Sequence, residues 1–444
     1  MTSPTVAPTP VPPTAAPKKP VKVEGVAFGW WEGYTGNERS EWIAKFTEEN
    51  GRAPKDEEIP VFDKYAFWNA INAKLKEEKP EYDVSWELLE WKDGRPKMEV
   101  RFAAGDPADL VVWSIVDCMR YALLGALVDV KPALEDRIAE FDPNFLTSLK
   151  GEYIQVPFQG FVHGWRLNRV PFRQAGVEDL LPSEKTGWTW DHATFLEATK
   201  AIRKGSGANA TWGFAGWGDW NMFYPVSFSY GGSAWAEDGK TFVLGDDEKG
   251  LKGVQFLIDM VKKEGIAPPE NVSSAVEDSI DTWYVEGRLG ISDVGTYAKY
   301  DWIKEQIALG KVDPAKVEYD AVVPPSDVQN GVKPQCYSST TGGCVFRRKE
   351  EERTQGAFEW LKVVLRPEYA VILKQSNWPI RKSAETESDQ DPARVTYRQE
   401  MRQFASSQLK MPYWVAVRPI MDPVWEALIA EAGKPADILK QAKA

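Results

Sequence analysis

The sequence contains few histidines, and this scarcity limits the catalytic chemistry that it can support. Only two, His163 and His192, occur in 444 residues. A metal site built on several histidines is therefore not expected, and a nucleophile activated by histidine has few candidates for its base. Motifs for a serine-hydrolase elbow, a zinc-peptidase helix, a paired-cysteine site or a dinucleotide loop are also missing. We expect no catalytic residues, no metal and no cofactor.

Long apolar runs and an excess of positive charge are missing as well. The longest apolar stretch, 121–130, is interrupted by Gly125 and falls far short of the roughly 20 residues of a membrane helix. Asp and Glu total 66 against 54 Lys and Arg, so the net charge is −12. This charge argues against non-specific binding to nucleic acid and against docking on anionic lipid. We expect no nucleic-acid partner and no membrane span.

Cysteine is scarce, with three residues in the chain. Cys336 and Cys344 lie close together in a segment rich in Gly, Ser and Thr, whereas Cys118 stands alone. In an exported protein the nearby pair could form a disulfide, and in a reducing compartment both would stay thiols. The spacing leaves both alternatives open. If a disulfide forms, we predict that it joins Cys336 to Cys344 and leaves Cys118 as the thiol.

Length and periodicity predict two α/β lobes. A chain of 444 residues exceeds the roughly 250–300 residues that one hydrophobic core reaches. Strand-like segments such as 21–28 alternate with segments such as 63–79, where apolar residues recur at helical spacing. Asp191, and Asp246 or Asp247, are predicted to cap helices. This alternation is typical of α/β layers with mainly parallel strand pairing.

The first 20 residues are rich in Pro, Thr and Ala and contain no aromatic residue. We predict a disordered tether here, because such a composition cannot bury enough apolar surface to order itself. The tether is the kind expected of an exported protein whose export signal has been removed; an ordinary disordered terminus of a cytosolic protein is the alternative.

Tryptophan, in contrast, is abundant. It occurs 20 times, and aromatic residues make up 12% of the chain. Many of these rings stand beside Gly, Asp, Glu or Asn rather than on helical stripes, most densely at 216–221. Flat apolar rings next to hydrogen-bonding groups suit ligands that have both C–H faces and hydroxyl edges. The pattern favours a sugar ligand.

The order of several segments resembles that of the extracellular solute-binding proteins of carbohydrate ABC importers, the family of maltodextrin-binding proteins. The matching segments are 105–113, 124–130, 151–158, 189–195, 231–239, 286–291, 357–362 and 378–381. They include Gly-Asp-Pro-Ala-Asp at 105–109 and Trp-Pro-Ile-Arg at 378–381. The resemblance covers about 21–432. It departs from the family pattern at 50–66, which with a second helix precedes the second strand, and at His192 and Ala193.

The resemblance implies a two-lobed, periplasmic-binding-protein-like α/β fold of type II, with a ligand cleft between lobes joined by hinge strands. The implied division of the chain is a tether at 1–20, a first lobe at 21–158 and 290–344, and a second lobe at 159–289 and 345–444. It also implies a periplasmic or extracellular protein that touches the membrane only through a removed or lipid-anchored N-terminus.

The candidate ligand-binding residues follow expected strands or lie in aromatic turns. For Trp30 and Trp113 a core position is the alternative, and for Asp117 it is a helix cap. The candidates are Trp30, Trp31, Glu32, Trp113, Asp117, Gln159, Trp217, Asp219, Trp220, Asn221, Tyr297, Trp378, Arg381 and Trp425.

These observations together predict a monomeric binding protein that captures a sugar or oligosaccharide and delivers it to the permease subunits of an ABC transporter. One alternative is a binding protein for another polar solute, such as an anionic sugar derivative, a polyol or a peptide; Arg381 and Arg418 leave room for an anion. A signalling receptor of the same fold is a second alternative. A carbohydrate-active enzyme is the third, because 66 carboxylates leave room for a glycosidase pair.

Overall fold

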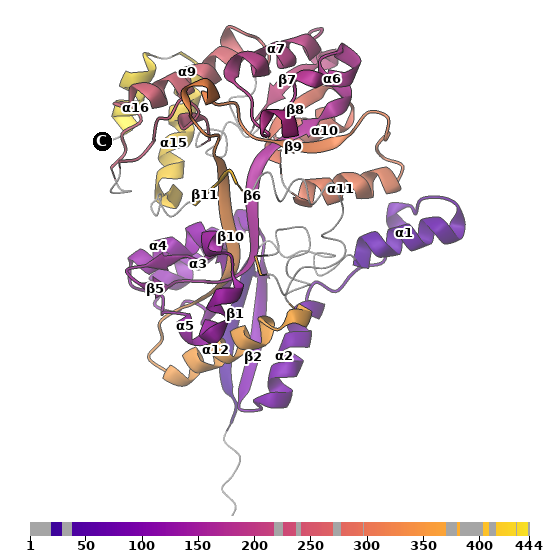
Figure 1. The fold of residues 1–444 in the computed structure, drawn as a ribbon. Coiled ribbons are helices and arrows are strands. Elements are labelled where there is room, and N and C mark those ends of the chain that lie inside the picture. The colour runs from indigo at the N-terminus through magenta and orange to yellow at the C-terminus, as the bar shows by residue number, and fades with distance from the viewer. Residues whose placement is uncertain are drawn as a thin grey trace, which may run out of the picture.

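The computed structural model describes residues 19–28, 38–216, 225–236, 241–269, 277–295, 297–369, 380–381, 403–407, 414–431 and 433–442. Along these residues strands and helices alternate and form two α/β lobes, one above the other in Figure 1. Two long strands, β6 (Val156–Asn168) and β10 (Cys336–Val345), run between the lobes. The predicted α/β class and two-lobed fold are confirmed.

Nine strands of the described part of the chain form one continuous sheet. Its main order is β2-β1-β3-β10-β6-β8-β7, while β9 (Tyr319–Val322) pairs with β6 and β11 (Ala405–Ser407) pairs with β10. β6 and β10 are antiparallel to each other and form the middle of the sheet. A separate ladder joins β4 (Ser148–Leu149) to β5 (Glu152–Tyr153).

The lower lobe is built on parallel strands. β1 (Val21–Phe28) lies between β2 (Tyr82–Leu89) and β3 (Leu110–Ser114) and is parallel to both. The last four residues of β1 are buried, as is typical of a parallel strand with neighbours on both sides and helices packed on the sheet. The helices and turns of this lobe are α2 (Ala66–Glu78), α3 (Trp91–Ala103), α4 (Ile115–Leu123), α5 (Lys131–Leu134), η2 (Glu135–Glu140), η3 (Pro143–Phe145) and α12 (Glu351–Val364).

Three tryptophans form part of the lower core. α2 buries Phe67, Trp68, Ile71 and Leu75, the helical spacing expected from the sequence. The ring of Trp68 lies 4.1 Å from that of Trp86 in β2 and 5.7 Å from that of Trp360 in α12. These rings therefore serve packing, and the abundance of tryptophan has a structural component besides any role in binding.

The upper lobe carries the second parallel pair, β7 (Trp212–Ala215) and β8 (Leu289–Gly295). Its helices and turns are α6 (Arg169–Ala175), η4 (Glu178–Leu180), η5 (Glu184–Thr186), α7 (His192–Ile202), η6 (Gly207–Asn209), α9 (Glu248–Lys262), α10 (Glu277–Val285), α11 (Tyr297–Ala308), η8 (Val328–Asn330), α15 (Trp414–Ile429) and α16 (Pro435–Ala442). Two of them begin at a predicted cap. The carboxylate of Asp191 accepts from the backbone N–H of Thr194 at 2.7 Å, and that of Asp247 accepts from Lys249 at 3.1 Å.

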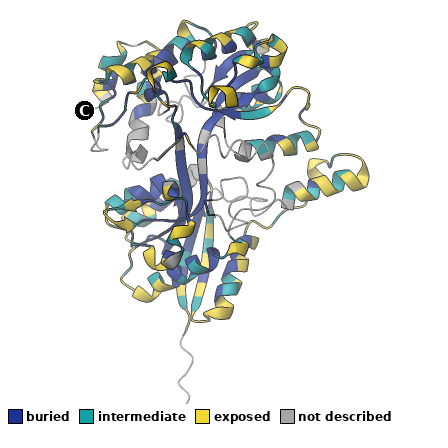
Figure 2. Ribbon diagram, in the orientation of Figure 1, coloured by how far each residue is buried: buried dark blue, intermediate teal, exposed yellow. Residues whose placement is uncertain are grey.

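Burial follows the layered arrangement. Figure 2 shows the central strands as mostly buried and the outward faces of the helices as exposed. Within the described ranges no helix is both long and apolar enough to cross a membrane. The same residues contain no group of His, Cys, Asp or Glu that could hold a metal ion.

The cysteine prediction was wrong. Cys118 in α4 and Cys344 in β10 form a disulfide, with their Cα atoms 6.5 Å apart, and Cys336 is a buried free thiol. Cys336 and Cys344 lie at opposite ends of β10. A strand rises ~3.3 Å per residue, which separates these ends by roughly 26 Å, whereas a disulfide requires Cα atoms within about 7 Å.

Two elements differ from the predicted division into lobes. α12 falls in 345–444, which was expected in the second lobe, but it packs on α2 and β1 of the lower lobe. β8 falls in 290–344, which was expected to return to the first lobe, but it pairs with β6 and β7 in the upper lobe. The reason is that β10 itself carries the chain back to the lower lobe, so the crossing comes later than predicted.

Candidate functional site

The strand directions bring the carboxyl ends of two parallel pairs toward each other. β6 runs from the lower lobe to the upper one, and β10 runs antiparallel to it. β3 is antiparallel to β10, so β3 and its parallel neighbour β1 run upward. β8 is antiparallel to β6, so β8 and β7 run downward. In open α/β sheets ligands bind outside the carboxyl ends of the strands, which makes the region between the lobes the candidate site (Figure 1).

Trp113 lies at the carboxyl end of β3, on the lower side of this region. Its ring is parallel to that of Phe28, the last residue of β1, at a centroid distance of 4.2 Å and an interplanar angle of 1°. Tyr121 lies 6.0 Å away on α4, and only 2% of Trp113 is exposed. One face of the indole is therefore covered by Phe28. Trp113 therefore packs within the lower lobe. This agrees with the alternative interpretation, in which Trp113 is a core residue.

Asp117 lies in the first turn of α4, directly after β3. Its carboxylate accepts two hydrogen bonds from Arg95 of α3, from Nε at 2.8 Å and from Nη2 at 3.0 Å. Asp117 is 2% exposed, and its charge also interacts favourably with the N-terminus of the helix. The carboxylate thus ties α3 to α4 beside the candidate site.

Gln159 belongs to a row of polar residues on β6 and β10, the two strands that run between the lobes. In β10 the consecutive residues 338–341 carry hydroxyl groups and are all buried. Thr341 is opposite Gln159 of β6 on one side and opposite Ser114 of β3 on the other. Gln159, which is 3% exposed, therefore lies two strands away from the residue that follows Trp113. The structure brings Trp113, Asp117 and Gln159 to one edge of the lower lobe.

Gln155 is a buried polar residue beside the candidate site that the sequence analysis missed. Its Nε2 donates to the carbonyl oxygen of Trp113 at 2.9 Å, and its Oε1 accepts from the Thr340 hydroxyl at 2.6 Å. Nε2 also lies 3.7 Å from Sγ of Cys118. Gln155 therefore links β3, β10 and the disulfide. The signal in the sequence was the run of four hydroxyl-bearing residues at 338–341. Hydroxyl groups in a buried strand need buried hydrogen-bond partners, and Gln155 is one of them.

The upper side of the region begins where β7 and β8 end. Gly216 follows β7 directly and is buried, and Asp293 in β8 is 1% exposed. Tyr297 is the first residue of α11, just after β8, and only its backbone is described. The remaining candidates lie outside the described residues; they are Trp30, Trp31, Glu32, Trp217, Asp219, Trp220, Asn221 and Trp378.

Arg381 is held by the protein itself. Its Nη1 donates to the carbonyl oxygen of Leu365 at 2.6 Å, just after α12, and its guanidinium lies 5.3 Å from the ring centre of Phe141. Burial lowers the pKa of Arg381 to about 10, while the nearby Glu140 opposes this shift. Trp425 in α15 is 4% exposed and belongs to the hydrophobic core. Both side chains are integrated into the packing of the fold.

Solved structures of the same fold cover nearly the whole chain. The ABC substrate-binding protein Lmo0181 from Listeria monocytogenes, in complex with cycloalternan, is 17% identical, with 96% of this chain and 97% of that chain covered and a TM-score of 0.67. The maltose/maltodextrin-binding domain MalE from Bdellovibrio bacteriovorus, bound to maltotriose, is 14% identical, with 95% and 98% covered and a TM-score of 0.68. The cyclic alpha-maltosyl-1,6-maltose binding protein from Arthrobacter globiformis is 15% identical, with 96% and 97% covered and a TM-score of 0.67. At these identities the likeness establishes a shared fold.

No curated protein matches the sequence. The family described as bacterial extracellular solute-binding protein, in contrast, matches residues 60–371, which is more than half of the 444-residue chain. The matched range includes β2, β3, β6, β7, β8 and β10, the strands that surround the candidate site together with β1. The chain therefore belongs to the family of bacterial extracellular solute-binding proteins.

Proposed function

We propose that this protein is the substrate-binding component of an ABC importer and that it captures a sugar or oligosaccharide between its lobes. The observation that carries the proposal is the meeting of strand ends between the lobes. Candidate aromatic residues follow three of these ends in the sequence: Trp30 and Trp31 follow β1, Trp217 and Trp220 follow β7, and Tyr297 follows β8. The bound ligands of the structural neighbours, such as cycloalternan and maltotriose, support a carbohydrate.

In this proposal, indole faces stack on the C–H faces of the sugar rings, and neighbouring polar groups bind the hydroxyls. Asp219, Asn221 and Glu32 are the candidates for those hydrogen bonds, and Gln159 lies at the crossing strands. β6 and β10 act as the hinge about which the lobes close over the ligand. The closed protein then delivers the sugar to the permease subunits. The sugar leaves unchanged, because the role of the protein is capture and not catalysis.

The site of action follows from the same proposal. The family is one of extracellular proteins, so the chain works outside the cytoplasm. The Pro- and Thr-rich stretch at 1–20 then serves as a tether, and in the native form a lipid anchor at its start holds the protein near the permease.

A thermal-shift screen tests the proposal. The panel contains maltose, maltotriose, cycloalternan, laminaribiose and ribitol, with a peptide mixture as the non-sugar arm. A ligand at 100 times its Kd adds about 2.7 kcal/mol to the free energy of unfolding, so a sugar ligand gives a clear rise in Tm. Chromatography of the sugar after incubation checks that it is returned intact. A response to peptides alone contradicts a sugar ligand, and release of shorter sugars contradicts a purely binding role.

A further inference from the structure

An arm of the lower lobe reaches across to the upper lobe. It consists of α1 (Glu38–Asn50), the residues 51–55 and η1 (Asp56–Glu58), and we call residues 38–58 the arm. Both of its connections lead to the lower lobe, because β1 ends at Phe28 before it and α2 begins at Ala66 after it. In Figure 1, α1 projects sideways from the body at the level between the lobes. It includes part of the segment in which the sequence departs from the family pattern.

The partner of the arm is α11. The core of the upper lobe includes Ile303 of α11 together with Trp212 of β7 and Leu289 of β8, so α11 is part of that lobe. α1 packs against α11, and Arg39 Nε donates to Glu305 Oε1 at 3.1 Å. These side chains are 33% and 17% exposed, so the ion pair is partly shielded from water.

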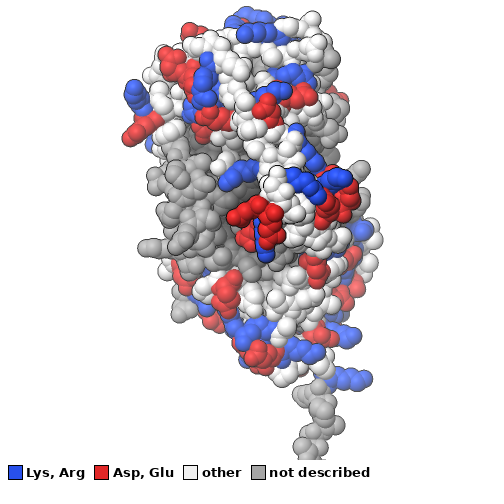
Figure 3. All heavy atoms as spheres, turned by 90° about the vertical axis from the view of Figure 1, so that its right-hand side faces the viewer, with Lys and Arg blue, Asp and Glu red and all other residues white. Residues whose placement is uncertain are grey.

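A second ion pair of opposite polarity lies at the other end of the arm. Nζ of Lys311, just after α11, donates to both carboxylate oxygens of Asp56, at 2.7 and 3.0 Å. The hydrogen bond from Lys311 lowers the pKa of Asp56 below its usual value, as expected of a carboxylate that is paired with an ammonium group. The arm thus contributes the cation of one ion pair, Arg39, and the anion of the other, Asp56. Figure 3 shows acidic and basic side chains together on this side of the molecule, at mid-height.

Contacts inside the arm make it one body. Trp42 and Phe46 stack along α1 at 5.1 Å, and the guanidinium of Arg52 lies 5.1 Å from the ring centre of Phe46. Arg52 also donates two hydrogen bonds to Glu58, at 2.8 and 2.6 Å. The contacts of Arg52 with Phe46 and Glu58 therefore hold α1 and η1 together.

We propose that the arm is a strap between the lobes, and that Arg39 and Asp56 are positioning residues that favour the arrangement seen here over a more open one. The inference rests on the proposed capture of a ligand between the lobes. A contact that only the closer arrangement makes raises its population, and with it the affinity for a ligand that binds that arrangement.

The distance between the lobes in the ligand-free protein is the first readout. Spin labels at Lys79→Cys after α2 and Lys252→Cys in α9 report it by pulsed electron resonance. Both positions are exposed, and the native cysteines are either bridged or buried. We expect a longer mean distance in Arg39→Glu and in Lys311→Glu. We expect the same change for the unaltered arm when NaCl is raised from 20 to 500 mM, because salt screens exposed pairs.

Two variants separate ion pairing from a general effect of charge. Lys45→Glu makes the same charge change on the same helix, but among the described residues Lys45 pairs with Glu49 of α1, at 3.8 Å, and not with the upper lobe, and so the distance should not change. The exchange Arg39→Glu with Glu305→Arg restores a pair of opposite charges and should restore the short distance. The proposed strap is refuted if Arg39→Glu and Lys45→Glu change the distance between the lobes equally. It is also refuted if the exchanged pair fails to restore the short distance.

The affinity for maltotriose is the second readout. Exposed ion pairs have small energies, so we expect each single variant to raise the Kd about two- to fivefold, with recovery in the exchanged pair. An unchanged Kd in variants whose lobes have moved apart would overturn the role of the strap in affinity. If no sugar of the panel binds, the proposed function fails, whereas the distances in the ligand-free protein still decide whether the strap exists.

Discussion

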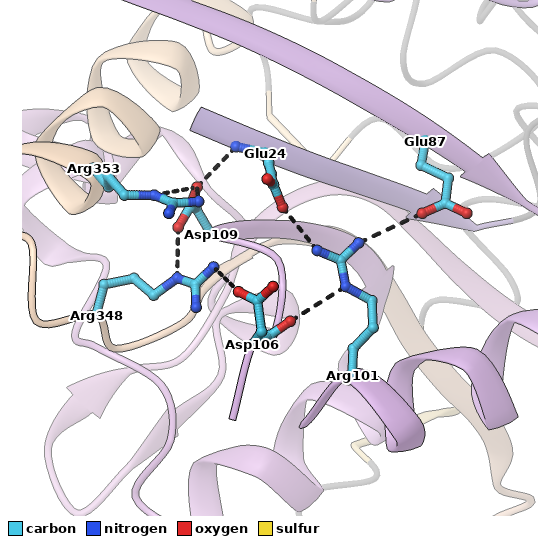
Figure 4. Close-up of polar contacts among 7 residues, drawn as sticks. All are labelled: Glu24, Glu87, Arg101, Asp106, Asp109, Arg348 and Arg353. Atoms are coloured by element: carbon cyan, nitrogen blue, oxygen red, sulfur yellow. Dashed lines mark hydrogen bonds and ion pairs between the residues drawn. The ribbon is translucent and has the colours of Figure 1, made fainter. Parts of the chain in front are cut away.

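Asp109 is expected to be one of the most important single side chains for the stability of the lower lobe. It directly precedes β3, the strand that leads to the candidate site, and is fully buried. Figure 4 shows its carboxylate between Arg348, Arg353 and the backbone of Glu24. Oδ1 accepts from Arg348 Nε at 2.7 Å, while Oδ2 accepts from Arg353 Nη2 at 2.7 Å and from the Glu24 N–H at 2.8 Å. One carboxylate, at the start of β3, thus contacts β1, the segment between β10 and α12, and α12 itself.

We predict that Asp109→Asn lowers the free energy of unfolding by about 3–5 kcal/mol. The variant keeps the shape of the side chain but removes its charge and turns one acceptor into a donor that faces an arginine. Breaking a buried ion pair from one side costs this much because the remaining charge is left buried without compensation. The two arginines here are 9% and 25% exposed, which places the expected loss in the lower half of that range.

Asp106→Asn is the matched control. Asp106 also accepts from Arg348, from Nη2 at 3.1 Å, but its side chain is 72% exposed. Exposed pairs contribute about 0.2–1 kcal/mol, so this variant should unfold almost like the unaltered protein.

Denaturant unfolding followed by tryptophan fluorescence measures both variants, because Trp68, Trp86 and Trp360 report on the lower lobe. Equal losses in Asp106→Asn and Asp109→Asn, or a loss below 1 kcal/mol in Asp109→Asn, would refute the reasoning from burial.

Three further predictions concern the disulfide, His192 and the aromatic residues at 216–221. Reduction of the Cys118–Cys344 disulfide, which joins residues 226 apart, should cost about 2–5 kcal/mol in denaturant unfolding; a double alanine variant should be insensitive to reductant, and a loss there on adding reductant would point to another cause. Burial lowers the pKa of His192 to about 4, against the partial opposition of Asp327 and Asp191. The folded protein therefore binds fewer protons than the unfolded one, and stability should fall as the pH drops from about 6.5 toward 4, by at most ~1.4 kcal/mol per pH unit. His192→Phe keeps a ring against Tyr230 and should flatten this slope between pH 7 and 5; parallel curves for the two proteins would contradict the assignment. Trp217→Ala or Trp220→Ala should weaken sugar binding roughly a hundredfold with little change in the ligand-free Tm, whereas early melting with normal binding, measured on the same samples, would place the rings in the core.

The sequence by itself determined the features that depend on neighbours along the chain. Asp247 caps α9 and Asp191 caps α7 because each carboxylate reaches an N–H two or three residues further on. The buried stripe of α2 follows from apolar residues that recur within single turns. The alternation of strands and helices over 444 residues then predicted two α/β lobes, and the order of short segments indicated the family.

The tertiary structure decided which distant segments meet. The disulfide joins Cys344 to Cys118 and not to the nearer Cys336, because β10 is extended and lies beside α4. Thr340 and Gln155 form a buried hydrogen bond because β10 and β6 are neighbours in the sheet, although many helices and strands separate them in the chain. α12 lies in the lower lobe because it follows β10, which carries the chain back to that lobe. Local patterns specify the conformation of each segment, whereas the order and register of the strands depend on the free energy of packing all segments at once, which no short stretch of sequence contains.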